Sequence, residues 1–414
     1  MALAIDSARL SAELDALGQI SEAPPPVVTR VVFSEADLRA RSYFKALCHD
    51  AGLVVREDAV GNTFAQWPGE SPELAPLATV SHIDAIPNAG RFDGTVGVLG
   101  GLEAIRALQR AGARPKRSIE LIAFTSEEPT RFGIGCLGSR LLGGVLDPSA
   151  GSTLRGKDGL TLNEARAAGG FSGSLESVRL KPGHYAAFVE LHIEQGPLLE
   201  QRGIPLGVVS SIAAPASLRL TIDGEGGHAG AVLMPARHDA FLAAAEIALA
   251  LEGAAKSSGA IDSVATTGVC DVFPGAVNSI PSRVKLEIDV RDIVEARRDA
   301  VLRALDAACT EVSVGRGVRV QTEVINADAP AECATQVMAA LERAASKHAL
   351  PFMKMVSRAY HDSLFMARIA PTGMLFIPCR GGVSHRPDEY ASPEAIAQGS
   401  LVLAEALLEL ANSV

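Results

Sequence analysis

The segment PLATVSHIDAIPNAGRFDGTVGVLGGLEAIRAL, residues 76–108, joins an apolar run to a helix-like run through a loop of turn-forming residues. The apolar run at 77–80 is typical of a buried strand, and the spacing of apolar residues over 95–108 predicts a helix. His82 and Asp84 stand at the end of the strand, and Asp93 lies in a glycine-bracketed turn before the helix. Because α/β proteins place their chemistry on loops at strand ends, we expect a functional site here.

Strand-like and helix-like segments alternate on both sides of this stretch. From about residue 35 to 212 the alternation predicts crossover units on a mostly parallel sheet with helices on both faces. From 213 to 328 the order changes to strand-helix-strand-strand-helix-strand, which is the pattern of a ferredoxin-like α+β domain. The α/β pattern then resumes. We therefore predict one α/β domain over 1–212 and 329–414, interrupted by a small inserted domain over 213–328.

Composition narrows the kind of partner. The chain has 414 residues with 48 acidic against 38 basic side chains, a net charge of −10, which disfavours nucleic acid and anionic membranes and favours a small molecule. Its six cysteines show no CxxC pair, so neither a disulfide framework nor a cysteine zinc site is indicated. No run of about 18 apolar residues and no signal-like start occur, so we expect a cytoplasmic protein.

Histidines and carboxylates follow four strands of the predicted sheet. They are His82, Asp93, Glu127, Glu128, His192 and His385. Singly, each has an ordinary interpretation, since an isolated histidine is usually a surface or core residue and a Glu-Glu pair a solvated cap. Together, at one edge of one sheet, they supply the imidazole and carboxylate ligands that zinc and manganese prefer, and a carboxylate can bridge two ions. The pattern predicts a metal site and suits two ions better than one.

One strand of the inserted domain carries a candidate ligand-binding cation. Residues 283–292, RVKLEIDVRD, alternate with a period of two, which demands one buried and one solvated face. Arg291 falls on the polar face, where it is free to meet a ligand. From the pattern alone, an exposed charge on a solvated strand is the favoured interpretation.

Seven motifs, in this order, resemble those of the hydantoinase/carbamoylase amidases. They are SHIDAIPNAGRFDGTVGV, EEPTRFG, LHIEQGP, GGHAG, NSIPSRVKLEIDVRD, YHD and GGVSHRPDEY. The group contains N-carbamoyl-L-amino acid hydrolases, β-ureidopropionases and allantoate amidohydrolases, within the larger superfamily of dinuclear metallopeptidases and aminoacylases. The resemblance covers nearly the whole chain. The peptidase branches commonly carry an acid where this chain has His192, so the amidase branch is favoured.

This resemblance implies a ligand set for two divalent ions, zinc or manganese, with cobalt or nickel also accepted by such ligands. One ion would be held by His82 and His192, and the second by Glu128 and His385, with Asp93 bridging both. Asp84 would accept a hydrogen bond from His82 and so fix its ring. Glu127, next to a ligand but not bound to metal, would be the general base.

The resemblance also implies residues that meet the substrate. His228 of GEGGHAG would stabilise the oxyanion, acting in its own chain or from a partner subunit. Arg291 would bind the substrate carboxylate, because a guanidinium fork matches that group. Gln195, Asn278 and His361 would be polar contacts. The inserted domain would serve as a lid and as the pairing surface of a homodimer.

The expected function is metal-dependent hydrolysis of a linear amide C–N bond in a ureido acid, with N-carbamoyl-L-amino acids as the favoured substrates. Allantoate amidohydrolase and β-ureidopropionase are alternatives within the same group. Two further alternatives are an aminoacylase or dipeptidase, and a non-catalytic binding protein on the same fold. The presence of every expected ligand and of Glu127 argues against the last of these.

Overall fold

The structure is a computed structural model that describes residues 3–413. The chain divides into two compact units. Unit 1 comprises the described residues through Ser210, then Glu332–Ser357, and the described residues from His361 onward, while unit 2 comprises Ser211–Ala331 and Arg358–Tyr360. The sequence predicted an insertion over 213–328, and the tripeptide Arg358–Tyr360 was not expected in the second unit.

Unit 1 is built on a nine-stranded sheet whose four central strands are parallel. They are β17 (Thr372–Ile377), β7 (Ala187–Ile193), β4 (Leu77–His82) and β6 (Ile119–Phe124), and every residue in them is buried. Strands covered on both faces read as continuous apolar runs, as these do. Beyond β6 come β3 (Thr63–Trp67) and β2 (Val54–Glu57), both antiparallel, and beyond β17 come β8 (Leu206–Ile212), β15 (Ala331–Glu332) and β16 (Phe352–Ser357).

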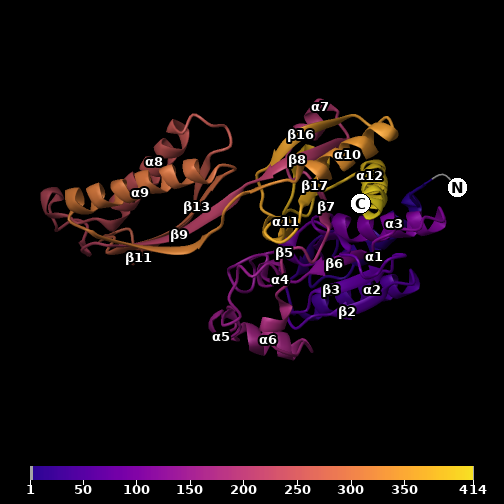
Figure 1. Ribbon diagram of the computed structural model, residues 1–414. Coiled ribbons are helices and arrows are strands. Elements are labelled where there is room, and N and C mark those ends of the chain that lie inside the picture. The colour runs from indigo at the N-terminus through magenta and orange to yellow at the C-terminus, as the bar shows by residue number, and fades with distance from the viewer. Residues whose placement is uncertain (1–2, 414) are drawn as a thin grey trace. The chain divides into compact units, whose positions relative to one another are not determined.

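Helices cover both faces of this sheet, as predicted (Figure 1). One face packs against α1 (Ser7–Gly18), α2 (Glu35–Asp50), α3 (Thr95–Arg110), α10 (Thr335–Lys347) and α12 (Pro393–Asn412). The other face packs against α4 (Leu137–Leu142), α6 (Leu162–Ala168), η1 (Leu175–Val178) and α11 (Asp362–Met366). Alternate residues of β4 serve the two cores, with Leu77 in the first and Ala78 and Val80 in the second.

Shorter elements lie in the connections of unit 1. They are β1 (Val28–Arg30) paired with β5 (Ala85–Ala89), α5 (Ala150–Thr153), α7 (Leu198–Arg202) and η3 (Arg380–Gly382). Helix α3 approaches the central strands closely through Gly97, where a Cβ would lie 2.3 Å from the Leu191 carbonyl oxygen. A side chain at 97 would therefore push α3, and with it the turn that carries Asp93, away from the strand ends.

Unit 2 is a four-stranded antiparallel sheet with two helices side by side on one face (Figure 1). Its elements are β9 (Ala214–Asp223), α8 (Ala240–Ser257), β11 (Val264–Phe273), β13 (Arg283–Asp292), α9 (Glu295–Arg316) and β14 (Arg319–Ala327). The strand order β11-β13-β9-β14 and the element order together give the predicted ferredoxin-like arrangement. A small ribbon pairs β10 (Gly227–His228) with β12 (Ser279–Ile280), and η2 (Met234–Ala236) follows β10.

The predicted fold class is confirmed, with antiparallel strands at both edges of the main sheet as the detail that the sequence pattern did not specify. Within the described residues, every helix is too short or too polar to cross a membrane.

Candidate metal centre

The candidate ligands stand where the parallel strands end. His82 is the last residue of β4, His192 is the next-to-last residue of β7, and Glu127 and Glu128 follow β6 by three and four positions. His385 lies in the loop after β17. Because parallel strands present their carboxyl ends at one sheet edge, side chains separated by hundreds of residues meet there.

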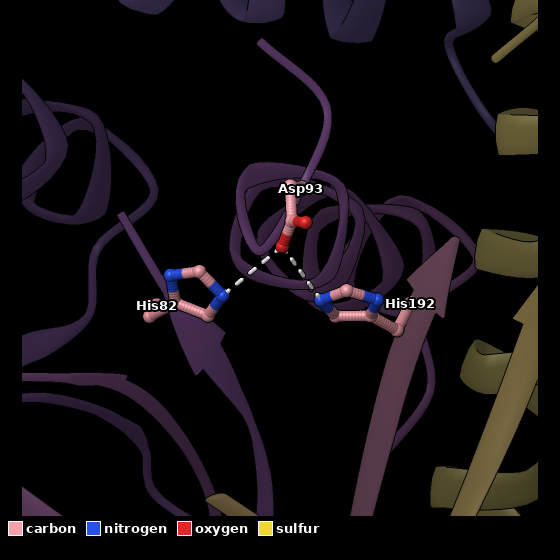
Figure 2. Close-up of side chains that lie close together, drawn as sticks. All are labelled: His82, Asp93 and His192. Atoms are coloured by element: carbon pink, nitrogen blue, oxygen red, sulfur yellow. Dashed lines mark ion pairs between the residues drawn. The ribbon is translucent and has the colours of Figure 1, made fainter. Parts of the chain in front are cut away.

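Three buried side chains form what we call the inner position: His82, Asp93 and His192. The Oδ1 atom of Asp93 lies 3.3 Å from His82 Nε2 and 3.2 Å from His192 Nε2, as Figure 2 shows. The three side chains are at most 8% exposed. One carboxylate oxygen therefore faces two imidazole nitrogens from opposite sides, inside the protein.

A second group, the outer position, uses the other oxygen of the same carboxylate. His385 Nε2 lies 3.3 Å from Asp93 Oδ2 and 3.3 Å from Glu128 Oε1. The ligand atoms of each group lie within 4.8 Å of one another. Asp93 thus joins the two positions, one oxygen to each, which is how the predicted bridging carboxylate would be placed.

Hydrogen bonds fix the tautomers of the two inner histidines. His82 Nδ1 lies 3.0 Å from the Asp84 carbonyl oxygen, and His192 Nδ1 lies 2.9 Å from the Ile193 carbonyl oxygen. A carbonyl oxygen only accepts, so each Nδ1 must carry the proton. The Gly94 N–H donates to His192 Nε2 at 3.2 Å, in agreement with a lone pair on that atom. Both Nε2 atoms are thereby set up as metal ligands.

The donor set fits divalent ions in spacing and in charge. Four ligands placed tetrahedrally about 2.0–2.1 Å from zinc are about 3.3 Å apart, and the Nε2 to carboxylate distances in the two positions are 3.2–3.3 Å. Buried carboxylates need compensating positive charge. With Asp84, Glu127 and Glu128 also buried beside Asp93, two divalent ions would supply that charge.

Glu127 lies beside the inner position without belonging to either group. Its Oε2 is 3.8 Å from His82 Nε2, and its Oε1 accepts a hydrogen bond from the Cys136 thiol at 3.5 Å. Burial raises the pKa of Glu127 well above its usual range, the neighbouring Glu128 raises it further, and His82 opposes both effects. A carboxyl group with a raised pKa, close to the ligands but not among them, can accept and return a proton.

Asp84 acts on the site differently from the prediction. His82 donates to the Asp84 backbone carbonyl, and the Asp84 carboxylate is 3.7 Å from His82 Nδ1. The carboxylate instead accepts the backbone N–H groups of Glu127 and Glu128, at 3.2 and 3.1 Å. The reason is geometric, because the turn after β4 presents the nearer carbonyl to the ring and aims the carboxylate at the next loop. Asp84 thus holds the loop that carries the Glu-Glu pair.

Asp93 is held by a network that the sequence did not reveal. Its Oδ2 accepts hydrogen bonds from Gln195 Nε2 and from the Ser384 hydroxyl, both at 2.6 Å. Glu389 accepts the N–H groups of Phe92 and Asp93 at 2.7 and 3.0 Å. Burial and the nearby Asp93 raise the pKa of Glu389 to about 7. Gln195, predicted to touch substrate, here donates a hydrogen bond to the Asp93 carboxylate.

The other predicted substrate contacts are divided between the units. His361 is buried in unit 1, with its ring 4.5 Å from that of His192 in an edge-on arrangement. His228 on β10 and Asn278 before β12 are exposed residues of unit 2. Arg291 also belongs to unit 2, where its Nε donates to Asp289 Oδ1 at 2.7 Å. The alternation along β13 placed Arg291 and Asp289 on one face but could not indicate that they pair.

Three supporting residues were missed by sequence reasoning. Ser384 and Glu389 both lie in the quoted GGVSHRPDEY motif, yet nothing in the motif distinguishes Glu389 from its neighbour Asp388 as the buried acid. Cys136 was considered only as one of six scattered cysteines. A cysteine close in sequence to a proposed base is a signal too weak to assign a contact.

Comparison with known proteins places the chain among hydrolases. Residues 78–409 match the profile of peptidase family M20/M25/M40. A ureidoglycolate hydrolase of Oryza sativa subsp. japonica is 53% identical over 98% of this chain and 85% of its own length. An N-carbamoyl-L-amino acid amidohydrolase of Geobacillus stearothermophilus is 38% identical over 99% of both chains. The crystal structure of AtUAH in complex with glyoxylate superposes with a TM-score of 0.93, at 51% identity and 99% coverage of both chains.

Proposed function

We propose that this chain, which belongs to peptidase family M20/M25/M40, acts on ureidoglycolate. Within the family it resembles the hydantoinase/carbamoylase amidases, as predicted, and it is therefore an amidohydrolase of ureido compounds. The observation that carries the proposal is the pair of ligand groups joined by Asp93, with the non-ligating Glu127 beside them, in a chain 53% identical to a ureidoglycolate hydrolase.

Ureidoglycolate is closely related to the N-carbamoyl-L-amino acids that the sequence favoured as substrates. Ureidoglycolate is an N-carbamoyl amino acid whose side chain is a hydroxyl, so it presents the same carboxylate and the same ureido group. Relatives named ureidoglycolate hydrolase are 53% and 51% identical, against 38% for an N-carbamoyl-L-amino acid amidohydrolase. These identities support ureidoglycolate, with N-carbamoyl-L-amino acids as the second candidate.

The residues of the inner and outer positions would hold two divalent ions of zinc or manganese. Such a pair, when bound, lowers the pKa of water and polarises the carbonyl that is attacked. Asp93 would contribute one oxygen to each position. Glu128 would complete the outer position, and Asp84 would keep Glu127 and Glu128 in place through their N–H groups.

Glu127 would move the proton of the reaction. It takes a proton from the attacking water as the water oxygen bonds to the ureido carbonyl carbon. It returns this proton to the nitrogen attached to the α-carbon as the bond between this nitrogen and the carbonyl carbon breaks. The products are hydroxyglycine and carbamate, and carbamate decomposes to ammonia and carbon dioxide. Loss of ammonia from hydroxyglycine then gives glyoxylate. Solved structures named AtUAH hold glyoxylate and (S)-hydroxyglycine.

Unit 2 would supply the remaining groups. His228 would donate to the oxyanion that develops on the carbonyl oxygen, a contact worth about 2.7–4 kcal/mol of barrier for a comparable donor. Arg291 would bind the substrate carboxylate with its guanidinium, already oriented by Asp289 and by the Tyr360 ring 5.5 Å away. Asn278 of unit 2 would be a further polar contact, and unit 1 would add one through His361.

The first experiment is a substrate comparison with a matched pair. Chelated protein is reloaded with manganese or with zinc and assayed for ammonia and glyoxylate on ureidoglycolate and on N-carbamoylglycine, which differ only in the α-hydroxyl. We expect metal-dependent release of glyoxylate and two ammonia molecules from ureidoglycolate, and at least roughly tenfold lower kcat/KM on N-carbamoylglycine, since a site built for a hydroxyl leaves its partner unpaired without one.

Other substrates decide between the alternatives. Equal or higher kcat/KM on N-carbamoyl-L-amino acids would replace ureidoglycolate with the second candidate. Ammonia from allantoate or β-ureidopropionate alone would assign those activities instead. Metal-loaded protein that leaves every one of these ureido substrates unchanged would remove the proposed function.

Homodimerisation through unit 2 is part of the proposal. Helix α8 carries apolar side chains that face solvent, with Leu249 67% and Phe241 42% exposed, and such residues are often covered by a partner. Sedimentation should show a dimer, and an active monomer would exclude both the dimer and a role of His228 across subunits. The cytoplasmic location stays a prediction.

A further inference from the structure

The two metal positions differ in how far their ligands are shielded from water. His82 and His192 are each 1% exposed, and Asp93, which both positions share, is 8% exposed. In the outer position Glu128 is buried, but the His385 side chain is 45% exposed. An ion leaves when water replaces its ligands one after another. Water reaches the outer position through His385, whereas the inner position presents no exposed ligand.

The imidazole rings also differ in how firmly they are held. His82 and His192 are each tied at Nδ1 to a backbone carbonyl oxygen, at 3.0 and 2.9 Å. Within residues 3–413, no comparable hydrogen bond secures the second nitrogen of His385, whose backbone has the left-handed φ of 59° that is unfavourable for a non-glycine residue. Loss of such an anchor typically costs 10–100-fold in metal affinity. His385 must give up more freedom on binding an ion than either inner histidine.

The bridging carboxylate adds a third difference. Its Oδ1, on the inner side, faces the two Nε2 atoms, while its Oδ2, on the outer side, accepts 2.6 Å hydrogen bonds from Gln195 and from Ser384. An oxygen that already accepts two hydrogen bonds has less electron density to offer a cation. The outer ion therefore shares its carboxylate oxygen with two donors, and the inner ion does not.

We propose that the inner position retains its ion while the outer position exchanges its ion with the medium, so that occupancy of the outer position switches activity on and off. This inference rests on the proposed metal pair and adds which of the two ions is released. The chain would then remain folded around the inner ion when free metal falls, and would regain activity by binding a single ion through Glu128 and His385.

The test measures metal content together with activity. Protein loaded with Mn²⁺ is dialysed against a chelator, and samples are taken for metal analysis, for the EPR signal that distinguishes coupled from isolated Mn²⁺, and for ureidoglycolate turnover. We expect activity and the coupled signal to disappear together at one ion per chain, with the second ion leaving at least roughly tenfold more slowly. Returning one equivalent of Mn²⁺ should restore both.

Two variants assign the positions. His385→Ala should bind a single Mn²⁺ and retain it as long as the slow ion of the unchanged protein is retained. His49→Ala, which removes an exposed histidine of α2, should keep two ions and both rates. The inference is overturned if the two ions leave at one rate, or if His385→Ala loses all its metal while remaining folded by circular dichroism. Failure of the unchanged protein to bind any ion would instead reject the proposed metal pair itself.

Discussion

Replacement of Gly94 by alanine tests whether the turn after Asp93 must approach the His82 ring without a side chain. A Cβ on residue 94 would lie 2.5 Å from His82 Cε1 and 2.5 Å from Nε2. Ordinary contacts between such atoms begin near about 3.5 Å, so the ring or the turn must move by about 1 Å. Metal ligands tolerate errors of about 0.2 Å. The ring has nowhere to retreat, because it is buried and tied to the Asp84 carbonyl oxygen.

A second glycine serves as a control that distinguishes the clash with the His82 ring from the cost of placing alanine in a left-handed backbone conformation. Gly94 has φ 66° and Gly112 has φ 74°, but a Cβ at 112 would meet nothing within 4 Å. The left-handed conformation alone costs a non-glycine residue roughly 1–2 kcal/mol, so both alanine variants should lose about that much stability. Only Gly94→Ala should also displace His82 from the inner position.

Metal titration and thermal unfolding of the two variants give the result. We expect Gly112→Ala to bind two ions with unchanged affinity and to unfold at a modestly lower temperature. Gly94→Ala should lose at least one ion and its turnover, with His82 no longer in register with Asp93. If Gly94→Ala keeps both ions and full activity while losing no more stability than Gly112→Ala, the close approach at His82 has no functional importance.

Four other substitutions or titrations test separate parts of the site. Glu127→Gln should lower kcat by about 10²–10⁴-fold with two ions still bound, and near-normal turnover would exclude it as the base. Glu389→Ala should weaken metal binding in calorimetry by about 10–100-fold, whereas Glu103→Ala, which removes an equally buried carboxylate from the α1–α3 contact, should lower only the unfolding temperature. Hydrogen bonds to two carboxylates raise the pKa of His385 to about 11, so the metal-free ring is protonated at neutral pH and metal must displace that proton. The affinity for metal should therefore rise with pH, and binding should release a proton. Binding heats that are the same in buffers of different ionisation enthalpy would contradict this. Arg291→Lys should raise KM strongly at normal metal content, and unchanged kinetics would remove this residue from the substrate site.

The fold was predictable because each unit has a regular order of strands and helices along the chain. The buried runs that became β4, β6, β7 and β17 read as central parallel strands, and the order of elements over 213–328 indicated a ferredoxin-like unit. The antiparallel edge strands were not predictable, because an edge strand such as β2 has an exposed, weakly patterned sequence. The tripeptide Arg358–Tyr360 joins unit 2 through contacts such as Arg358 with Asp262, which no local pattern indicates.

The candidate ligands were predictable from the sequence, whereas the contacts of the residues that hold them in place were not. Strand ends in one parallel sheet must meet, so a histidine or acid at each end is placed by topology alone. The contacts of the residues that hold the ligands in place depend on where side chains point within turns. Asp84 accepts from the Glu127 and Glu128 amides because its turn aims it there, and Glu389 reaches the Asp93 amide from 296 positions away. Sequence spacing carries no information on either direction.

The division of Asp93 between the two positions links catalysis to stability. Histidines from β4, β7 and the loop after β17 converge on its two oxygens, and Glu128 from the loop after β6 lies beside His385, so each proposed ion would tie together segments that are otherwise held by packing. An ion that binds only the folded chain stabilises it by about 2.7 kcal/mol at a free concentration 100 times its dissociation constant. The tightly held inner ion that we propose would supply most of this stabilisation wherever free metal exceeds its dissociation constant. The proposed outer ion, bound at a free concentration near its dissociation constant, would add little stability, so its loss would not unfold the site that it completes.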